Sequence, residues 1–123
     1  MDHRSAARIT AAGRVAIGAA LLVAPQAVTK GWVGPTGAEP GGRLLGRSIG
    51  VRDLVLGLGV LAALDRGDPR ARDWVRAAAT ADVGDALATA LAYRHLPKRS
   101  RFGVLAIAAG AAVAGFVAAD NLD

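Results

Sequence analysis

Six ionisable residues lie at the predicted depth of the membrane interior within largely apolar stretches, and they are the residues of this chain best suited to chemistry. They are Arg14, Arg47, Arg52, Asp53, Asp82 and Asp85. Ionisable groups in such stretches commonly mark ligand sites, proton relays or substrate paths. They are also the groups from which a buried lattice of ion pairs is built, so both interpretations stay open.

Asp82 and Asp85 are three residues apart, which places both carboxylates on one face of a helix, and Thr89 continues that face four residues later. Two carboxylates at close range can share a proton, and the protonated one can act as a general acid. This spacing fits a membrane-embedded isomerase or cyclase that uses Asp82 or Asp85 as acid or base. An arginine close to the pair favours a structural role instead, so the partners of this helix decide between the two.

The same six residues sum to no net charge and can neutralise one another in a helical bundle. Left unpaired in a bilayer, they would cost on the order of 15 to 20 kcal/mol in total on insertion scales. Asp53 lies in a row of glycines, Gly46, Gly50 and Gly57, that allows a neighbouring helix to approach closely. Arg14 is our first candidate for the partner of Asp53. The sequence therefore predicts a network of Arg/Asp pairs that holds the helices together.

Four stretches of about 20 residues, the length that a membrane-spanning helix requires, position these side chains. They cover residues 6–24, 44–64, 74–93 and 102–119. We expect an all-α fold with a single integral membrane domain over residues 1–123, built as a four-helix transmembrane up-down bundle with both termini on one side. Residues 26–43 are rich in Gly and Pro and show no periodicity, which predicts a loop.

The composition favours lipid over other partners. The chain has 123 residues, 53% of them apolar, together with a net charge of +5 and a mean hydropathy of +0.35. One basic run lacks interleaved aromatic residues, so anionic lipid headgroups suit it better than nucleic acid: Arg94, Lys98, Arg99 and Arg101. The absence of cysteine excludes disulfides and thiolate metal sites, and the two histidines lack metal-ligand spacing. We expect no cofactor and no metal.

Small and aromatic residues indicate how the helices pack and how deep they lie. Gly110, in a ridge of alanines on the last stretch, predicts close packing inside the bundle, or else against another copy in a homodimer or larger complex. Internal packing is the preferred interpretation. Trp32, Trp74 and Tyr93 fall at stretch ends or in the connector, where amphipathic rings anchor a protein at the membrane interface. Lys and Arg divide six against six between the two sides, so they predict no orientation.

The pattern GRxxGxRDxxxGL at residues 46–58, together with Asp82-x-x-Asp85, carries a resemblance. With a preceding helix that holds an internal Arg and ends at a proline, it resembles an uncharacterised family of small four-helix integral membrane proteins, a domain of unknown function, and more remotely the DoxX-like group. The resemblance implies a four-helix membrane fold and no reaction, substrate or cofactor. We therefore expect a multi-pass protein of the cell inner membrane whose Arg/Asp cluster holds the bundle together. A binding or transport module for a small polar or lipid ligand is the alternative.

Overall fold

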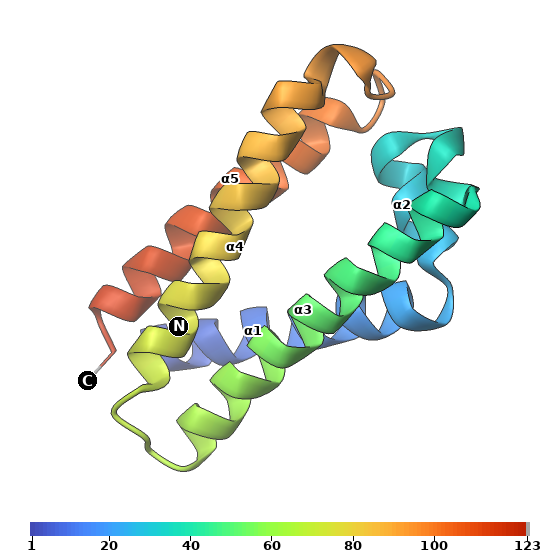
Figure 1. Ribbon diagram of the computed structural model, residues 1–123. Coiled ribbons are helices and arrows are strands. Elements are labelled where there is room, and N and C mark those ends of the chain that lie inside the picture. Colours follow the sequence, from blue (N-terminus) through green and yellow to red (C-terminus); the bar gives the residue numbers. More distant parts are fainter. Residues whose placement is uncertain (123) are drawn as a thin grey trace.

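The computed structural model describes residues 1–122, which form four long helices, one short helix and two short 3-10 helices (Figure 1). In chain order these elements are α1 (His3–Val23), α2 (Pro25–Val33), η1 (Pro35–Ala38), α3 (Pro40–Asp65), α4 (Ala71–Ala92), η2 (Tyr93–His95) and α5 (Arg101–Asp120). No strand occurs in residues 1–122. The prediction of an all-α fold is therefore confirmed.

The prediction of a loop over residues 26–43 is wrong, because most of this segment is helical. A proline is the first residue of each of three helices, α2, η1 and α3: Pro25, Pro35 and Pro40. At that position the missing N–H would be unpaired in any case, and the fixed φ of proline suits a helix. The Thr29 hydroxyl holds α2 against η1 by donating to Gly37 O at 2.6 Å. The prolines that suggested a loop therefore mark the starts of helices.

The long helices form two antiparallel pairs, α1 with α3 and α4 with α5, and both chain ends lie at one end of the molecule (Figure 1). The α1–α3 pair packs through glycines. A Cβ on Gly50 would lie 2.8 Å from Leu21 Cβ, and a Cβ on Gly57 would lie 2.8 Å from Ala11 O. Gly46 is buried in the same row and faces α2. The glycine row of α3 is thus the surface that its neighbours approach.

The predicted internal packing of Gly110 is wrong. Gly110 is exposed, and no neighbouring atom lies within 4 Å of the position that its Cβ would take. The glycine of α5 that contacts α4 is Gly115, where a Cβ would lie 2.8 Å from Ala79 Cβ. Because Gly115 lies five residues after Gly110, it occupies a different face of the helix. Ala106 and Ala114 of the predicted ridge are exposed as well, whereas Ala118 at its end is buried in the core.

All four long helices meet in an apolar core at the end that carries the chain termini. Its buried residues are Ala7, Ala11, Val60, Ala63, Leu64, Ala71, Val75, Ala118, Ala119 and Leu122. The ion pairs Arg8–Asp65 and Arg76–Asp120 link the helix ends around this core. The Asp2 carboxylate caps α1 by accepting the Ser5 N–H, and this hydrogen bond lowers the pKa of Asp2.

Two of the long helices, α1 and α5, are long and apolar enough to cross a membrane. The helices α3 and α4 do not qualify as candidate spans, because they carry more charged residues. Only 17% of the 18-residue apolar segment of α5 is buried, so the rest of the protein does not enclose this helix. Each of the four predicted membrane spans corresponds to one long helix. Two of these helices, α1 and α5, are apolar enough to be candidate spans.

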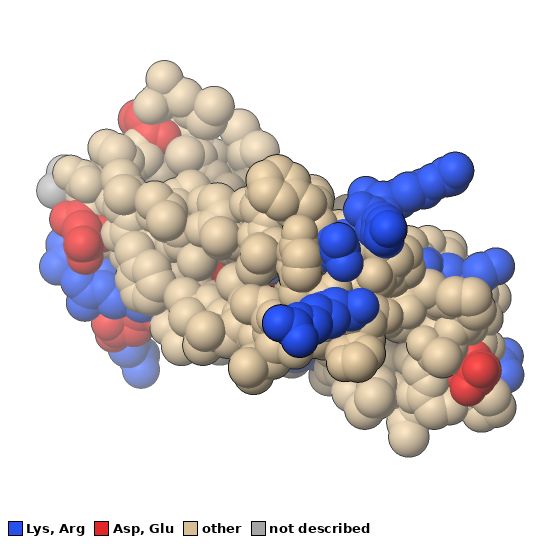
Figure 2. Space-filling model, turned by 90° about the horizontal axis from the view of Figure 1, so that it is seen from above, with Lys and Arg blue, Asp and Glu red and all other residues tan. Residues whose placement is uncertain are grey.

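Acidic and basic side chains lie together at the left end of the molecule in Figure 2, and mainly basic ones lie from its middle to its right end, with a largely uncharged surface between the two groups. The end formed by α2, η1 and the α4–α5 connection holds one acidic residue, Glu39, and seven basic ones: Lys30, Arg43, Arg47, Arg94, Lys98, Arg99 and Arg101. The end with the chain termini mixes the two signs. The positive charge of the chain is therefore concentrated at the α2 end.

Candidate functional site

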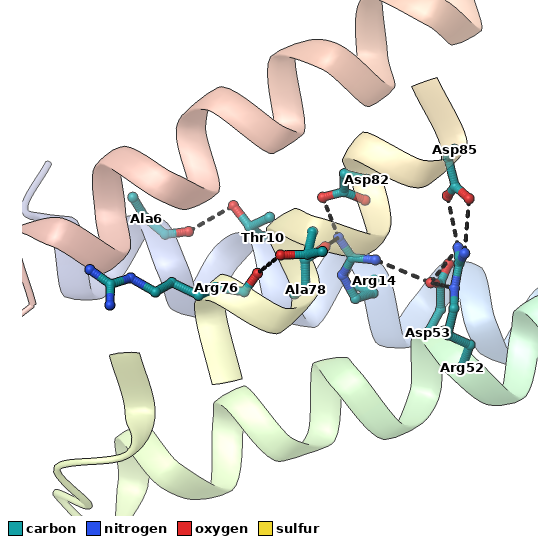
Figure 3. A network of polar contacts seen from close by, with 10 residues as sticks. Ala6, Thr10, Arg14, Arg52, Asp53, Arg76, Ala78, Asp82 and Asp85 are labelled. Carbon is teal, nitrogen blue, oxygen red and sulfur yellow. Dashed lines mark hydrogen bonds and ion pairs between the residues drawn. The ribbon is translucent and has the colours of Figure 1, made fainter. Parts of the chain in front are cut away.

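Arg14 lies at the centre of a buried network that joins three helices (Figure 3). From α1, its guanidinium donates to Asp53 Oδ1 on α3 at 3.1 Å and to Asp82 Oδ2 on α4 at 2.5 Å. The exposed fractions are 9% for Arg14, 7% for Asp53 and 8% for Asp82. The pairing of Arg14 with Asp53 that the sequence predicts is present, and Asp82 shares the same guanidinium.

Arg52 extends the network toward the α2 end. It binds both oxygens of Asp85, at 2.8 Å and 2.7 Å, and also contacts Asp53 Oδ1 at 3.2 Å. A planar guanidinium matches a carboxylate in this two-point geometry, which gives the contact directional specificity. The charges alternate along the resulting chain, which starts and ends on α4: Asp82, Arg14, Asp53, Arg52 and Asp85 (Figure 3).

Arg47 is not part of this network, and its assignment to the buried cluster is wrong. Its side chain is exposed, and its Nε donates to Leu22 O at 3.2 Å. Arg47 precedes Arg52 by five residues, so the two side chains leave α3 in different directions. Without Arg47 the network holds two guanidiniums and three carboxylates. It therefore carries one excess negative charge when its acids are ionised.

Thr89 lies further along the same helix face as the two acids of α4 and has its own partner. It is 2% exposed, and its Oγ1 accepts the Trp32 Nε1–H at 3.2 Å. Ser100, just before α5, donates to Trp32 O at 3.3 Å. Trp32 therefore links α2 to the α4–α5 pair at the end opposite the core. This role of Trp32 was not predicted, because the sequence placed it in a loop.

The other two predicted interface anchors lie at opposite ends of α4. The Arg101 guanidinium lies over the Tyr93 ring, with Arg101 Cζ 4.4 Å from the ring centroid. This is a cation–π contact across the α4–α5 connection. Trp74 lies against Gly59 of α3 and packs on the core. Both rings therefore also hold neighbouring elements together.

An apolar cleft of about 390 Å³ lies between the two helix pairs, with the charge network along one wall. Such a volume is typical of small-molecule sites. Four of its lining residues are charged, namely Arg14, Asp53, Asp82 and Asp85. The apolar lining comes mainly from α1, α2 and α5 and includes Ile17, Leu21, Val28, Val104, Ile107 and Ala108.

The cleft opens to the outside between α1 and α5. Ile17 of α1 is 51% exposed and Ile107 of α5 is 73% exposed, and both line it. Ala7, Ala11 and Ala118 join these helices in the core at the end with the termini. Trp32 lines the cleft at the α2 end. The cleft is therefore bounded at both ends and open at the side.

Two carboxylate oxygens of the network have no hydrogen-bond partner in residues 1–122. They are Asp53 Oδ2 and Asp82 Oδ1, since the arginines bind only Oδ1 of Asp53 and Oδ2 of Asp82. The described residues contain no buried side-chain oxygen or nitrogen that lacks a partner, so these two oxygens are accessible. Because both residues line the cleft, the cleft is the space from which they are reached.

Asp82 and Asp85 do not form a proton-sharing pair in this arrangement. They accept from different guanidiniums, Arg14 and Arg52, and no hydrogen bond joins their carboxyl groups. Over the described part of the chain, no group of three or more His, Cys, Asp or Glu side chains is arranged to hold a metal ion. The geometry therefore favours structure and binding over acid–base chemistry.

No protein-family model, curated protein or solved structure matches this chain. The resemblance to the uncharacterised four-helix family and to the DoxX-like group stays a prediction. The function is therefore inferred from the geometry of the site.

Proposed function

We propose that this chain is a multi-pass membrane protein that binds a small amphipathic molecule in the cleft between its two helix pairs. The observation that carries the proposal is the cleft itself, about 390 Å³ in volume, apolar, open at the side and lined by charge along one wall. The Arg/Asp network has two roles in this account. It fastens the two helix pairs together, and it supplies the polar part of the binding site.

The outward faces of the long helices support a membrane location. Ile9, Val55, Leu87 and Val113, one on each long helix, are all more than half exposed. Large apolar side chains in such numbers are unfavourable in water and stable against lipid. The central charges of α3 and α4 are paired inside the protein, so these helices also present apolar faces outward. We therefore assign all four long helices as membrane spans.

The two charged ends fit the two headgroup regions of a bilayer. Seven basic residues against one acidic residue give the α2 end an attraction for anionic headgroups. Trp32 and Tyr93 lie near this end and Trp74 lies near the other, at the depths where aromatic anchors collect. This assignment makes anionic lipid a partner of the α2 end.

The position of the opening suggests how a ligand enters. The opening lies between α1 and α5, which are the two helices with the composition of a membrane span. An amphipathic molecule can therefore enter sideways from the lipid. Its apolar part would lie along α5, against a stripe at helical spacing formed by Val104, Ile107, Ala108 and Ala111. Its polar group would then face the carboxylates of the network.

Two neighbouring alanines of α5 provide the test. Ala108 lines the cleft, whereas Ala109 is exposed and outside it. Native mass spectrometry of the protein purified in mild detergent should detect a retained small molecule on the wild type and on Ala109→Phe, and none on Ala108→Phe. A bare wild-type protein, or equal retention by both variants, would contradict the binding function.

A purely architectural role for the network is the second candidate. It is favoured by the observation that every fully inaccessible side-chain oxygen or nitrogen of the described residues has a hydrogen-bond partner. It predicts that the wild type carries no ligand in the same measurement, while removal of single charges unfolds the protein. Ligand retention therefore separates the two candidates.

A further inference from the structure

We propose that the ligand of the cleft carries an organic cation, a protonated or quaternary amine attached to an apolar body. The proposal rests on the binding function proposed above and names the chemical class of the ligand. It follows from the charge balance of the network, from its accessible oxygens and from the remaining lining of the cleft.

The charge balance favours a positive ligand. Asp53, Asp82 and Asp85 face two guanidiniums, those of Arg14 and Arg52, so one carboxylate charge is not neutralised. An isolated charge is costly in a site that is largely removed from water. A bound cation would bring the network to neutrality, whereas a bound anion would raise its negative charge to two.

The accessible oxygens point in the same direction. An ionised carboxylate oxygen can only accept a hydrogen bond. Asp53 and Asp82, whose side chains are 10% and 11% exposed, each present one such oxygen without a protein donor, and both line the cleft. An ammonium group can donate hydrogen bonds to these two oxygens, and its positive charge neutralises the excess carboxylate charge. Asp85 offers no comparable atom, because Arg52 occupies both of its oxygens.

The rest of the lining favours an organic cation over a metal ion. Hard metal cations require six or more oxygen ligands, and no metal-binding group of side chains occurs in residues 1–122. The walls are instead aliphatic, with Trp32 at one end. An indole ring is the strongest cation–π partner among the side chains. An apolar body with an attached amine therefore matches the carboxylates, the aliphatic walls and the indole ring of the lining.

Three probes that share one apolar body test the charge preference. They are 1-naphthylmethylamine, which is protonated at pH 7, the neutral 1-naphthylmethanol and the anionic 1-naphthoate. Binding is measured by titration calorimetry on the full chain in phosphatidylcholine nanodiscs, with empty nanodiscs as the blank. The amine should bind about tenfold more tightly than the alcohol, as a hydrogen bond to a charged partner implies, and the acid should bind most weakly.

Two variants locate the effect. Asp82→Asn keeps an oxygen for Arg14 and removes the excess charge, so it should reduce the amine to the affinity of the alcohol. Arg47→Gln, which changes an exposed charge outside the cleft, should leave all three affinities unchanged. The comparison of the three probes on the wild type needs no variant, so the proposal stays testable if Asp82→Asn does not fold.

The outcomes separate this proposal from the binding function on which it rests. Equal affinities for the amine and the alcohol, both lost in Ala108→Phe, would overturn the cation preference and leave cleft binding in place. Tighter binding of the acid would also overturn it. Failure of all three probes to bind, or binding that survives Ala108→Phe, would contradict the cleft site and the cation preference together.

Discussion

Arg14 Nη2 on α1 lies 2.5 Å from Asp82 Oδ2 on α4, across the boundary between the two helix pairs. The same guanidinium contacts Asp53 of α3 through its Nη1. Arg52 also binds carboxylates of both pairs, but its side chain is 33% exposed, whereas that of Arg14 is 8% exposed. Arg14 is therefore the most buried polar link between the α1–α3 pair and the α4–α5 pair.

Removal of the Arg14 charge should therefore destabilise the fold strongly. Arg14→Gln leaves Asp53 and Asp82 buried without their common partner, and the free energy of unfolding should fall by about 3–5 kcal/mol. Circular dichroism during thermal unfolding in mild detergent measures the effect. Arg47→Gln is the matched control, since Arg47 is exposed and should change little. Equal melting temperatures for the two variants would contradict the role of Arg14.

The Arg52–Asp85 pair should contribute less, because it is more exposed. Its side chains are 33% and 21% exposed, against 8% and 11% for Arg14 and Asp82. A double-mutant cycle with Arg52→Gln and Asp85→Asn should give a coupling energy of about 1 kcal/mol, within the range for directly contacting residues. The same cycle on Arg14 and Asp82 should give a larger value. The reverse order would show that burial does not set the strength of these pairs.

Glycine-to-alanine changes on α3 and α5 should have opposite outcomes. At Gly50 an added Cβ would lie 2.8 Å from Leu21 Cβ and 2.9 Å from Gly18 O, so the two helices must separate. We expect Gly50→Ala to lower the free energy of unfolding by about 1–3 kcal/mol. Gly110→Ala meets no neighbour and improves helix propensity, so it should be neutral or slightly stabilising. A loss of stability at Gly110 equal to that at Gly50 would contradict the assigned helix faces.

The hydrogen bond from Trp32 to Thr89 should be detectable in both stability and fluorescence. Thr89→Val keeps the side-chain shape but removes the acceptor of the indole N–H, which should cost about 1 kcal/mol. It should also shift the Trp32 emission in a Trp74→Phe background. Thr89→Ser retains the hydroxyl and serves as the control. If Val and Ser behave alike in both measurements, Trp32 does not link the helix pairs through this bond.

The composition of the network was largely predictable, because its chemistry is local. Charged residues in apolar stretches must find partners, and helical spacing places Asp82 and Asp85 on one face. The assignment of Arg47 to the network was wrong for a physical reason. A long side chain near the end of a helix can reach outward to a free carbonyl, here Leu22 O. Its exclusion changes the network from neutral to negative. Only the three-dimensional structure reveals that change.

The cleft and the short helix α2 were not predictable in the same way. The cleft arises from the angle between the two helix pairs, which depends on contacts between residues distant in sequence, such as Arg14 with Asp82 and Gly59 with Trp74. Helix α2 has nine residues, two of them Pro and Gly, and its stability comes from contacts with η1 and α3. Sequence periodicity carries little information about either feature.

The placement of the long helices across a bilayer, with the network inside, is the central claim. The chain contains no cysteine, so single cysteines can report on exposure to water from each side. The exposed residues Arg66 and Lys98 represent the two ends, and Val55 and Val113 represent the middle of the outward surface. Each is replaced by cysteine in turn and reconstituted in oriented vesicles. A membrane-impermeant maleimide is then added before and after permeabilisation.

If the long helices span the bilayer, Arg66→Cys is labelled from one side only and Lys98→Cys from the opposite side only. Val55→Cys and Val113→Cys should stay unlabelled in both conditions, because lipid covers them. Labelling of Arg66→Cys and Lys98→Cys from the same side, or labelling of the two valine positions as fast as the ends, would contradict the membrane-spanning arrangement.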